Sequence, residues 1–400
     1  MSLLLNQPTS LQRRWGLAAL IYLLGWLLGY WSLSTWDYPY PERWLLLAGL
    51  MLVVALTILG GNLRHNRRRE NGPLLPTLGY GNGLTLTRGL LLLLLTGFLF
   101  SPRPTAPLTW LPAILFTASR LIDCVDGYVA RITRHDTKLG AILDIEFDGL
   151  DLLVAVLLGI QYGVLPIWYL VLAVSRQLFV LGLWLRTKAG KPNREWPPSD
   201  NRRIIAAYQT GFITVMLWPG FAPPLSTLAS VLFAIPLIYS FGRDWLVASY
   251  VLDPESTFYQ RTRAAIKTFF EGWLPLIARL VAFGLTLLIL WREAPTFPHW
   301  QPYFTQSGVS GDWVLPLLAV LFVVAAGCVL LGIAGRVAAL LLIYLACLDI
   351  WASGFVWSEN ALLFTAASIA THLGSRWLTL WQPEEPVLRT HFGKREEPAA

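Results

Sequence analysis

The sequence predicts an all-α fold, a polytopic bundle of about twelve membrane-spanning helices. Of its 400 residues, 55% are hydrophobic and only 14% are charged. Soluble proteins carry about 25% charged residues, so this chain is far too apolar for that class. Long apolar runs recur along the chain, and short basic segments separate them. Because a bilayer is crossed by about 20 apolar helical residues, we expect an integral membrane protein.

The basic segments set the expected orientation of the chain in the membrane. They are residues 62–88, 131–138, 186–203 and 261–267. Basic loops favour the cytoplasmic side, and an even number of spans places both termini there as well. The net charge of +7 is explained by this topology. We therefore expect no nucleic-acid partner.

The N-terminal region, residues 1–79, is expected to hold two membrane helices and a basic linker. Residues 15–34 are rich in Leu and Trp, and residues 43–61 form a second apolar run after a short Pro/Tyr turn. No small-residue cleavage site follows the first run, so we interpret it as a retained span rather than a signal peptide. Packing or targeting is the expected role of these two helices.

Residues 80–252 are expected to form a six-helix domain. Its spans are predicted at residues 86–101, 108–131, 139–162, 165–186, 203–219 and 224–247. The second and third spans carry four carboxylates in a very apolar setting. Ionisable residues inside a membrane are usually functional, so we expect the functional site in these two spans.

The carboxylates follow an ordered pattern. Residues 123–148 read D-x2-D-G-x2-A-R-x8-G-x3-D-x3-D, with acidic pairs spaced i, i+3 and i, i+4. On helices, each pair lies on one face. The polar residues between Arg131 and Gly140 predict a turn, so the two helices are expected to pack antiparallel against each other. The two acidic pairs would then face each other near one end of the helix pair.

Four carboxylates gathered in this way predict a metal site. They repel one another and are costly near lipid, and a hard divalent cation with oxygen ligands relieves both problems. Mg²⁺ or Mn²⁺ is the expected ion, bound through carboxylates and phosphate oxygens. Gly127 and Gly140 expose backbone to a ligand, and Arg131 offers a fork of donors for a phosphate. The residues predict metal-assisted phosphoryl transfer, and the alternative is a polar helix pair sealed by ion pairs.

This pattern resembles the signature of the CDP-alcohol phosphatidyltransferase family, with every fixed position present. The resemblance extends over about residues 80–250. It implies a phosphotransferase of phospholipid biosynthesis that moves a phosphatidyl (substituted phosphate) group from a CDP-alcohol, above all CDP-diacylglycerol, to an acceptor alcohol and releases CMP. It also implies two divalent ions and an active site on the cytoplasmic side of a bacterial cytoplasmic (inner) membrane, among membrane lipids. A homodimer is left open.

The resemblance assigns roles to individual residues. The metal ligands that it implies are Asp123, Asp126, Asp144 and Asp148. Asp148 would also be the catalytic base that takes the proton of the acceptor. The CDP-binding positions would be Gly127, Ala130, Arg131 and Gly140, together with Asn82, Thr85 and Arg88.

The last three positions precede the acidic pattern. Asn82, Thr85 and Arg88 are spaced i, i+3, i+6 and share one helical face. They are similar to the N-x2-T-x2-R start of the family's first core helix. The alternative is an interfacial helix start in which Arg88 extends to the membrane surface.

The chain departs from the family pattern after the fourth core span. Many relatives have a Gly-Lys-x-Lys-Thr-like element there, whereas this sequence has S-D-N-R-R at residues 199–203. Two guanidinium groups suit a phosphate on the acceptor alcohol, so Arg202 and Arg203 are candidate acceptor-binding residues. The alternative is that they only set the topology of a cytoplasmic loop.

The remaining residues are expected to form a second membrane domain. Residues 253–269 are a basic cytoplasmic linker, and residues 270–382 hold about four spans. These are predicted at residues 271–291, 313–333, 337–355 and 360–380. The stretch L-G-I-A-G-R-V-A-A at 331–339 resembles DoxX-like four-helix membrane proteins. Residues 383–400 are charged and contain prolines, which predicts a disordered tail.

Two further function classes are open at this point. An ion-coupled transporter or lipid-binding membrane protein also uses intramembrane carboxylates, but a transporter predicts inverted repeats and no convincing repeat is present. The transporter hypothesis also gives no reason for the G-x2-A-R spacing. A non-catalytic scaffold is disfavoured because all four aspartates are retained. Release of CMP from CDP-diacylglycerol separates the three hypotheses.

Overall fold

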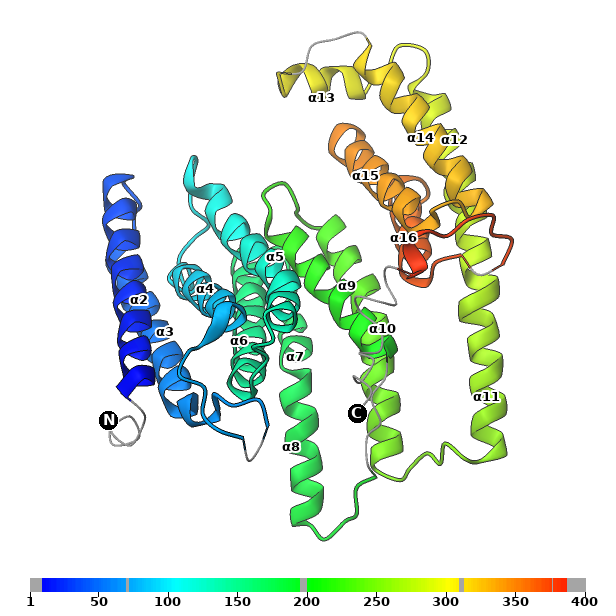
Figure 1. Cartoon of the computed structure of the whole chain (residues 1–400). Coiled ribbons are helices and arrows are strands. Elements are labelled where there is room, and N and C mark those ends of the chain that lie inside the picture. The colour runs from blue at the N-terminus through cyan, green and yellow to red at the C-terminus, as the bar shows by residue number, and fades with distance from the viewer. Residues whose placement is uncertain (1–8, 70–71, 195–199, 309–312, 376, 387–400) are drawn as a thin grey trace. The chain divides into compact units, whose positions relative to one another are not determined.

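A computed structural model gives the fold of the chain, which is α-helical almost throughout (Figure 1). The residues that the structure describes are 9–69, 72–194, 200–308, 313–375 and 377–386. None of them belongs to a β-strand, and one isolated parallel bridge joins Ile333 to Trp381. The predicted all-α class is confirmed.

The helices form two compact units, which are described separately. The first unit comprises residues 1–177 and 210–226, and the second comprises residues 178–209 and 227–400. The predicted boundaries of the N-terminal, central, linker and C-terminal domains stay predictions.

The first unit is built around one central helix. Its helices are α2 (Thr9–Thr35), α3 (Pro41–Asn62), α4 (Gly79–Thr96), α5 (Leu111–Ile132), α6 (Lys138–Gln161) and the short α7 (Tyr169–Ala173). Short 3₁₀ turns at Leu63–His65 and Leu108–Trp110 precede α4 and α5. The central helix is α4, because it packs against α2, α3, α5 and α6.

Small residues let α4 approach its neighbours. A side chain added at Gly89 would lie 2.8 Å from the ring of Phe147 on α6. A side chain added at Gly25 of α2 would lie 2.8 Å from Leu90. These contacts leave no room for larger residues, so α4 lies close to helices on two of its sides.

The turn between α5 and α6 is formed by polar residues, as predicted. Thr137 caps α6, because its hydroxyl accepts a hydrogen bond from the backbone N–H of Gly140 at 3.1 Å. Arg134 adopts the left-handed conformation, with φ of 49°. His135 Nε2 lies 2.9 Å from the carbonyl oxygen of Thr77, just before α4. The turn is therefore tied to the start of the central helix.

The second unit holds the rest of the chain. Its helices are α8 (Ser175–Lys188), α9 (Asp200–Leu217), α10 (Leu225–Ala248), α11 (Thr257–Thr268), α12 (Leu274–Glu293), α13 (Trp300–Gln306), α14 (Val314–Leu331), α15 (Gly335–Ser353) and α16 (Asn360–Leu373). The first residues of α8 and the last turns of α9 belong to the first unit. A π-helical turn at Phe269–Trp273 joins α11 to α12, so the predicted basic linker is largely helical.

Arg336 holds part of this unit together. Its Nη1 donates to the hydroxyl of Tyr208 on α9 at 2.9 Å and to the carbonyl of Thr371 on α16 at 2.7 Å. Its Nε donates to Glu385 at 2.9 Å. Glu385 lies in the segment predicted to be a disordered tail, so the start of that segment is in contact with α15. Residues 387–400 lie outside the described part of the chain.

Seven helices of the described chain are long and apolar enough to cross a membrane. They are Ser10–Thr35, Pro41–His65, Leu108–Ile132, Leu225–Ala248, Thr257–Glu293, Val314–Leu331 and Gly335–Ser353. α4 and α6 fall outside this group because they carry polar residues, among them Arg88 on α4 and Asp144, Asp148 and Asp151 on α6. Each of the twelve predicted spans overlaps a helix, but the total of twelve stays a prediction.

Candidate active site

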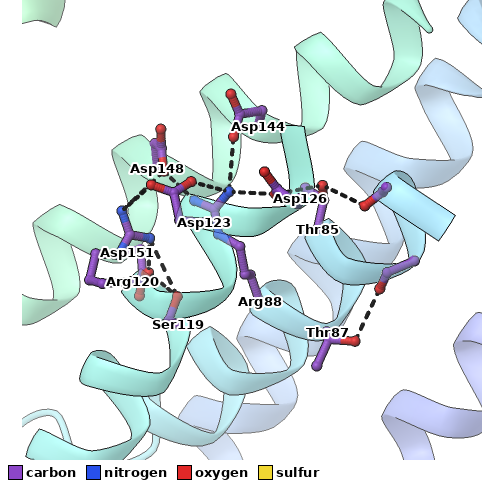
Figure 2. Close-up of polar contacts among 12 residues, drawn as sticks. Thr85, Thr87, Arg88, Ser119, Arg120, Asp123, Asp126, Asp144, Asp148 and Asp151 are labelled. Carbon is purple, nitrogen blue, oxygen red and sulfur yellow. Dashed lines mark hydrogen bonds and ion pairs between the residues drawn. The ribbon is translucent and has the colours of Figure 1, made fainter. Parts of the chain in front are cut away.

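The four aspartates of the predicted pattern converge beside α4 (Figure 2). Asp123 and Asp126 come from α5, whereas Asp144 and Asp148 come from α6. One carboxylate oxygen from each of Asp123, Asp126 and Asp144 lies within 4.8 Å of the others. The expectation that the two acidic pairs face each other is confirmed.

The helices that carry the aspartates pack differently from the sequence-based expectation. The turn predicted that α5 and α6 pack against each other, but the closest backbone contacts of both helices are with α4. The two helices meet each other through side chains, such as Arg120 of α5 and Asp151 of α6. A Cβ added at Gly81 would lie 2.6 Å from the Cβ of Ala130 on α5. A Cβ added at Gly140 of α6 would lie 2.3 Å from the Asn82 Oδ1. Small residues on both sides therefore allow α4 to reach both helices.

Arg88 of α4 lies at the centre of the aspartates and is 1% exposed. Its Nη1 lies 2.6 Å from Asp123, 3.1 Å from Asp126 and 2.9 Å from Asp144. Its Nη2 contacts Asp148. One guanidinium group is thus shared by all four carboxylates. The alternative in which Arg88 extends to the membrane surface is wrong, because the side chain is buried and paired.

A second arginine extends this network and was not predicted. Arg120 of α5 lies 3.1 Å from Asp148 and also contacts Asp151, which is 2% exposed. The hydroxyl of Ser119 donates a hydrogen bond to the same Asp151 oxygen. The sequence signal was weak, because Arg120 stands three residues before Asp123 in an otherwise apolar helix. A salt bridge at that spacing is common and carries no chemistry by itself.

Asn82 and Thr85 lie on the same face of α4 as Arg88, as predicted. The Thr85 hydroxyl donates to Asp126 at 3.0 Å. The Asn82 amide donates to the hydroxyl of Thr137 at 3.1 Å, and this hydroxyl caps α6. Both residues are buried. In the structure they position the aspartates and the start of α6.

The remaining predicted CDP-binding positions divide into two groups. Ala130 is the packing partner of Gly81, so packing already accounts for its small size. Gly127 faces an open surface, because a Cβ added there would meet only the Arg131 side chain, at 3.4 Å. Arg131 is exposed. This part of α5 therefore has room for a ligand close to the backbone.

The two candidate acceptor-binding residues cannot be placed beside this site. Arg202 and Arg203 lie in the first turn of α9, and their side chains lie outside the described part of the structure.

The chemistry of the donors fits a hard divalent cation. Among the side chains that the structure describes, the network contains five carboxylates and two guanidinium groups, which leaves an excess of negative charge. The side chains of Asp144 and Asp148 are 42% and 43% exposed, whereas that of Asp126 is 9% exposed. The site is therefore open on the α6 side. Clustered carboxylate oxygens with an open side suit Mg²⁺ or Mn²⁺, which keep water or phosphate oxygens as further ligands.

Comparison with known proteins agrees with this chemistry. Residues 79–242 match the family model of CDP-alcohol phosphatidyltransferase, a family known to use divalent metal ions. This range contains the helices α4 to α9 and most of α10, which continues to Ala248. The DoxX-like resemblance of the C-terminal region stays a prediction. No solved structure matches the chain.

Two curated relatives are similar to part of the chain. A CDP-diacylglycerol–glycerol-3-phosphate 3-phosphatidyltransferase of Bacillus subtilis (strain 168) is 37% identical over 73 residues, which is 18% of this chain and 38% of the relative. A protein of the same name from Cereibacter sphaeroides is 33% identical over 89 residues, which is 22% of this chain and 39% of the relative. The matched part thus spans about two fifths of the length of either relative.

The family model covers α4, α5 and α6 together, which are the helices that bring Arg88 and the four aspartates into one open acidic site. The chain therefore carries, at residues 79–242, a domain of the CDP-alcohol phosphatidyltransferase family.

Proposed function

We propose that the chain is a membrane phosphatidyltransferase that transfers a phosphatidyl group from CDP-diacylglycerol to an acceptor alcohol and releases CMP. The observation that carries this proposal is the convergence of all four pattern aspartates around the buried Arg88. The site lies within the residues that match the family model. In the reaction, an acceptor oxygen forms a bond to the phosphorus next to the diacylglycerol, and the bond from that phosphorus to CMP breaks.

Asp123, Asp126 and Asp144 are the proposed metal ligands, and Asp148 is a further one if two ions bind. When bound, a divalent ion would supply positive charge for the diphosphate and for the departing CMP. Arg88 positions these carboxylates from the buried side, because it contacts all of them. Thr85 fixes Asp126 through its hydroxyl. The chain itself thus holds the ligands in place before substrate arrives.

Asp148 is the proposed base that accepts the proton of the acceptor hydroxyl. Its contacts with Arg88 and Arg120 both use Oδ1. Two fixed contacts on one oxygen orient the carboxylate, and Oδ2 is then the oxygen that would receive the proton. Its side chain is 43% exposed, which gives an acceptor alcohol access.

The CDP moiety is proposed to lie along the open surface of α5. Gly127 permits close approach to the helix backbone, and Arg131 is an exposed guanidinium one turn further on. The close contacts of α4 with α5 and α6 are made by Asn82, Ala130 and Gly140, which pack between these helices. Their role toward CDP would then be indirect.

The acceptor is proposed to be a phosphorylated alcohol. Both curated relatives are named for glycerol 3-phosphate, and residues 199–203 of this chain replace the family's usual basic element with a pair of arginines. Arg202 and Arg203 could together bind one phosphate. We further propose that the site faces the cytoplasm of a bacterial cytoplasmic membrane, because the basic segments lie beside the site helices in the sequence.

The proposed function is tested with the purified full chain in detergent micelles containing CDP-diacylglycerol and Mg²⁺. CMP release and the lipid product are measured with glycerol 3-phosphate, inositol phosphate, glycerol, inositol and serine as acceptors. We expect rapid CMP release only with a phosphorylated alcohol, and a phosphodiester-linked lipid of matching mass. Absence of CMP release with every acceptor would contradict the proposed transfer.

The same assay tests the acceptor arginines. Replacing both Arg202 and Arg203 by Ala should raise KM for the phosphorylated acceptor by about 10-fold or more, because two charged hydrogen bonds of about 1.5–3 kcal/mol each are lost, less their desolvation. KM for CDP-diacylglycerol should stay nearly unchanged. Replacement of Lys188 and Lys191, in the same basic segment, is the matched control. A wild-type preference for a neutral alcohol would reduce the two arginines to topology determinants.

A further inference from the structure

A groove lies between α2 and α4, on the side of α4 away from the aspartates. It has a volume of about 550 Å³, which is within the range of small-molecule sites. Gly83, Leu86 and Leu90 of α4 form one wall. These positions lie nearly opposite the face that carries Thr85 and Arg88 on a helix with 3.6 residues per turn. Figure 2 shows Thr87, which also lines the groove, on the side of α4 away from the acidic cluster.

The groove is closed at one end and open at the other. At the closed end, the Tyr22 hydroxyl donates to the carbonyl of Leu86 at 2.5 Å, and Gly25 lies directly against Leu90. At the other end, Arg14 lines the groove together with His135 from the α5–α6 turn. The groove therefore runs along α2 from a cationic mouth to an apolar end.

The dimensions of the groove match one leaflet of a membrane. From Arg14 to Tyr22, the first and last residues of α2 that line the groove, the helix rises about 12 Å, at about 1.5 Å per residue. The hydrocarbon core of a bilayer is about 30 Å thick, so one leaflet contributes about half of that. Leu17 and Ile21 are 56% and 48% exposed along this wall, which places an apolar surface at the depth of an acyl chain. One acyl chain is thus the occupant that the length and lining fit.

Arg14 brings positive charge to the mouth, and a second basic segment is attached to the turn that contributes His135. Arg14 uses its Nε to donate to the carbonyl of Pro76 at 3.1 Å, which fixes the guanidinium at the rim. The basic segment at residues 64–69 is tied to the α5–α6 turn, because Arg68 donates to the carbonyl of Arg134. Asp136 is the one carboxylate of that turn. The balance of charge at this end favours an anionic headgroup.

We propose that this groove binds an anionic phospholipid of the surrounding membrane, with one acyl chain between α2 and α4 and the headgroup phosphate at Arg14. The site is separate from the proposed active site, because the two lie on opposite faces of α4. The inference does not depend on the proposed transferase reaction. It gives a role to α2, which lies outside the residues that match the family model.

The test uses phosphatidylglycerol with a diazirine in the middle of one acyl chain. The full chain is reconstituted in phosphatidylcholine vesicles that contain a small fraction of this probe and no CDP-lipid. After irradiation, adducts are mapped by mass spectrometry. We expect adducts on α2 between residues 14 and 22 and on α4 between residues 80 and 90. Excess unlabelled phosphatidylglycerol should remove them, whereas additional phosphatidylcholine should not.

Two pairs of variants separate specific binding from general contact with lipid. Gly83→Leu fills the groove, and Gly16→Leu is its matched control. At either position an added Cβ meets no atom within 4 Å, but of the two residues only Gly83 lines the groove. We expect labelling to fall at least fivefold in Gly83→Leu and to persist in Gly16→Leu. Arg14→Gln should lower the preference for phosphatidylglycerol about fivefold, the size expected for one cation at a membrane surface, and Arg13→Gln should not.

Three results would overturn the proposal. The first is equal labelling of Gly83→Leu and Gly16→Leu, and the second is equal competition by the two lipids in the wild-type chain. The third is a loss of CMP release from CDP-diacylglycerol in Gly83→Leu while its fold is intact, because the groove would then serve the substrate. Failure of transfer in the wild-type chain, with labelling as expected, would contradict the proposed function alone.

Discussion

The Nη1 of Arg88 lies 2.6 Å from Asp123 Oδ1, although one residue belongs to α4 and the other to α5. The same guanidinium reaches Asp144 on α6 at 2.9 Å. A single buried cation therefore joins the three helices that carry the site. Backbone packing of α5 and α6 on α4 brings the carboxylates together, and the side chains of Arg120 and Ser119 link α5 directly to α6.

This arrangement predicts that Arg88 is required for stability as well as for activity. Arg88→Met leaves the buried Asp126 and three partly exposed carboxylates without their shared cation, and breaking a buried ion pair from one side costs about 3–5 kcal/mol. We expect a lower midpoint of thermal unfolding in detergent, partly recovered by millimolar Mg²⁺ because the added cation replaces the lost charge. Arg13→Met, at an exposed position, is the control. An unchanged midpoint in Arg88→Met would show that the network does not stabilise the fold.

Two glycines of α4 are expected to differ in their tolerance of alanine. A Cβ at Gly81 would lie 2.6 Å from the Ala130 Cβ, so Gly81→Ala must push α4 away from α5. Overpacking of this kind costs about 1–3 kcal/mol, and it also displaces Thr85 and Arg88 from the aspartates. Gly83→Ala meets no atom within 4 Å and should retain both stability and CMP release. Thermal unfolding and initial rates of both variants provide the measurement; equal behaviour would contradict the close α4–α5 contact.

Asp148 and Asp151 are expected to have different roles although both contact Arg120. Asp148→Asn should reduce turnover by about 10² to 10⁴, because the proton acceptor is lost, and leave CDP-lipid binding and Mn²⁺ binding by Asp123, Asp126 and Asp144 largely intact. Asp151→Asn leaves Arg120 without its buried partner, so it should mainly lower the unfolding midpoint. Rates across pH 6 to 9 and unfolding curves distinguish the two. Normal turnover of Asp148→Asn over this range would remove it as the base.

Much of the site was predictable from sequence because its residues lie close together along the chain. The i, i+3 and i, i+4 spacings of the aspartates fix which face of each helix they occupy, and the polar turn fixes how the two helices are joined. Asn82, Thr85 and Arg88 likewise share a face by spacing alone. These relationships depend only on helical geometry, and this is why the predictions based on them were confirmed.

The contacts between helices were not predictable in the same way. Whether α6 packs on α5 or on α4 depends on small residues such as Gly81 and Gly140, which give no periodic signal. The partners of Arg120 depend on that choice, because Asp151 reaches it from α6. The number of membrane-spanning helices is difficult to predict from hydropathy for a related reason. Polar site residues lower the mean hydropathy of α4 and α6. A membrane helix that carries functional polar residues therefore has a hydropathy similar to that of a helix in a soluble protein.

The central claim is that the aspartates of α5 and α6 bind a divalent cation. It is tested most directly by Mn²⁺ titration of the purified full chain, followed by electron paramagnetic resonance of the free ion. We expect saturable binding by the wild-type chain, and at least a tenfold weaker affinity in Asp123→Asn, Asp126→Asn and Asp144→Asn. Glu146→Gln, at an exposed position of α6, should bind as the wild type does. Wild-type affinity in all three aspartate variants would contradict the metal site.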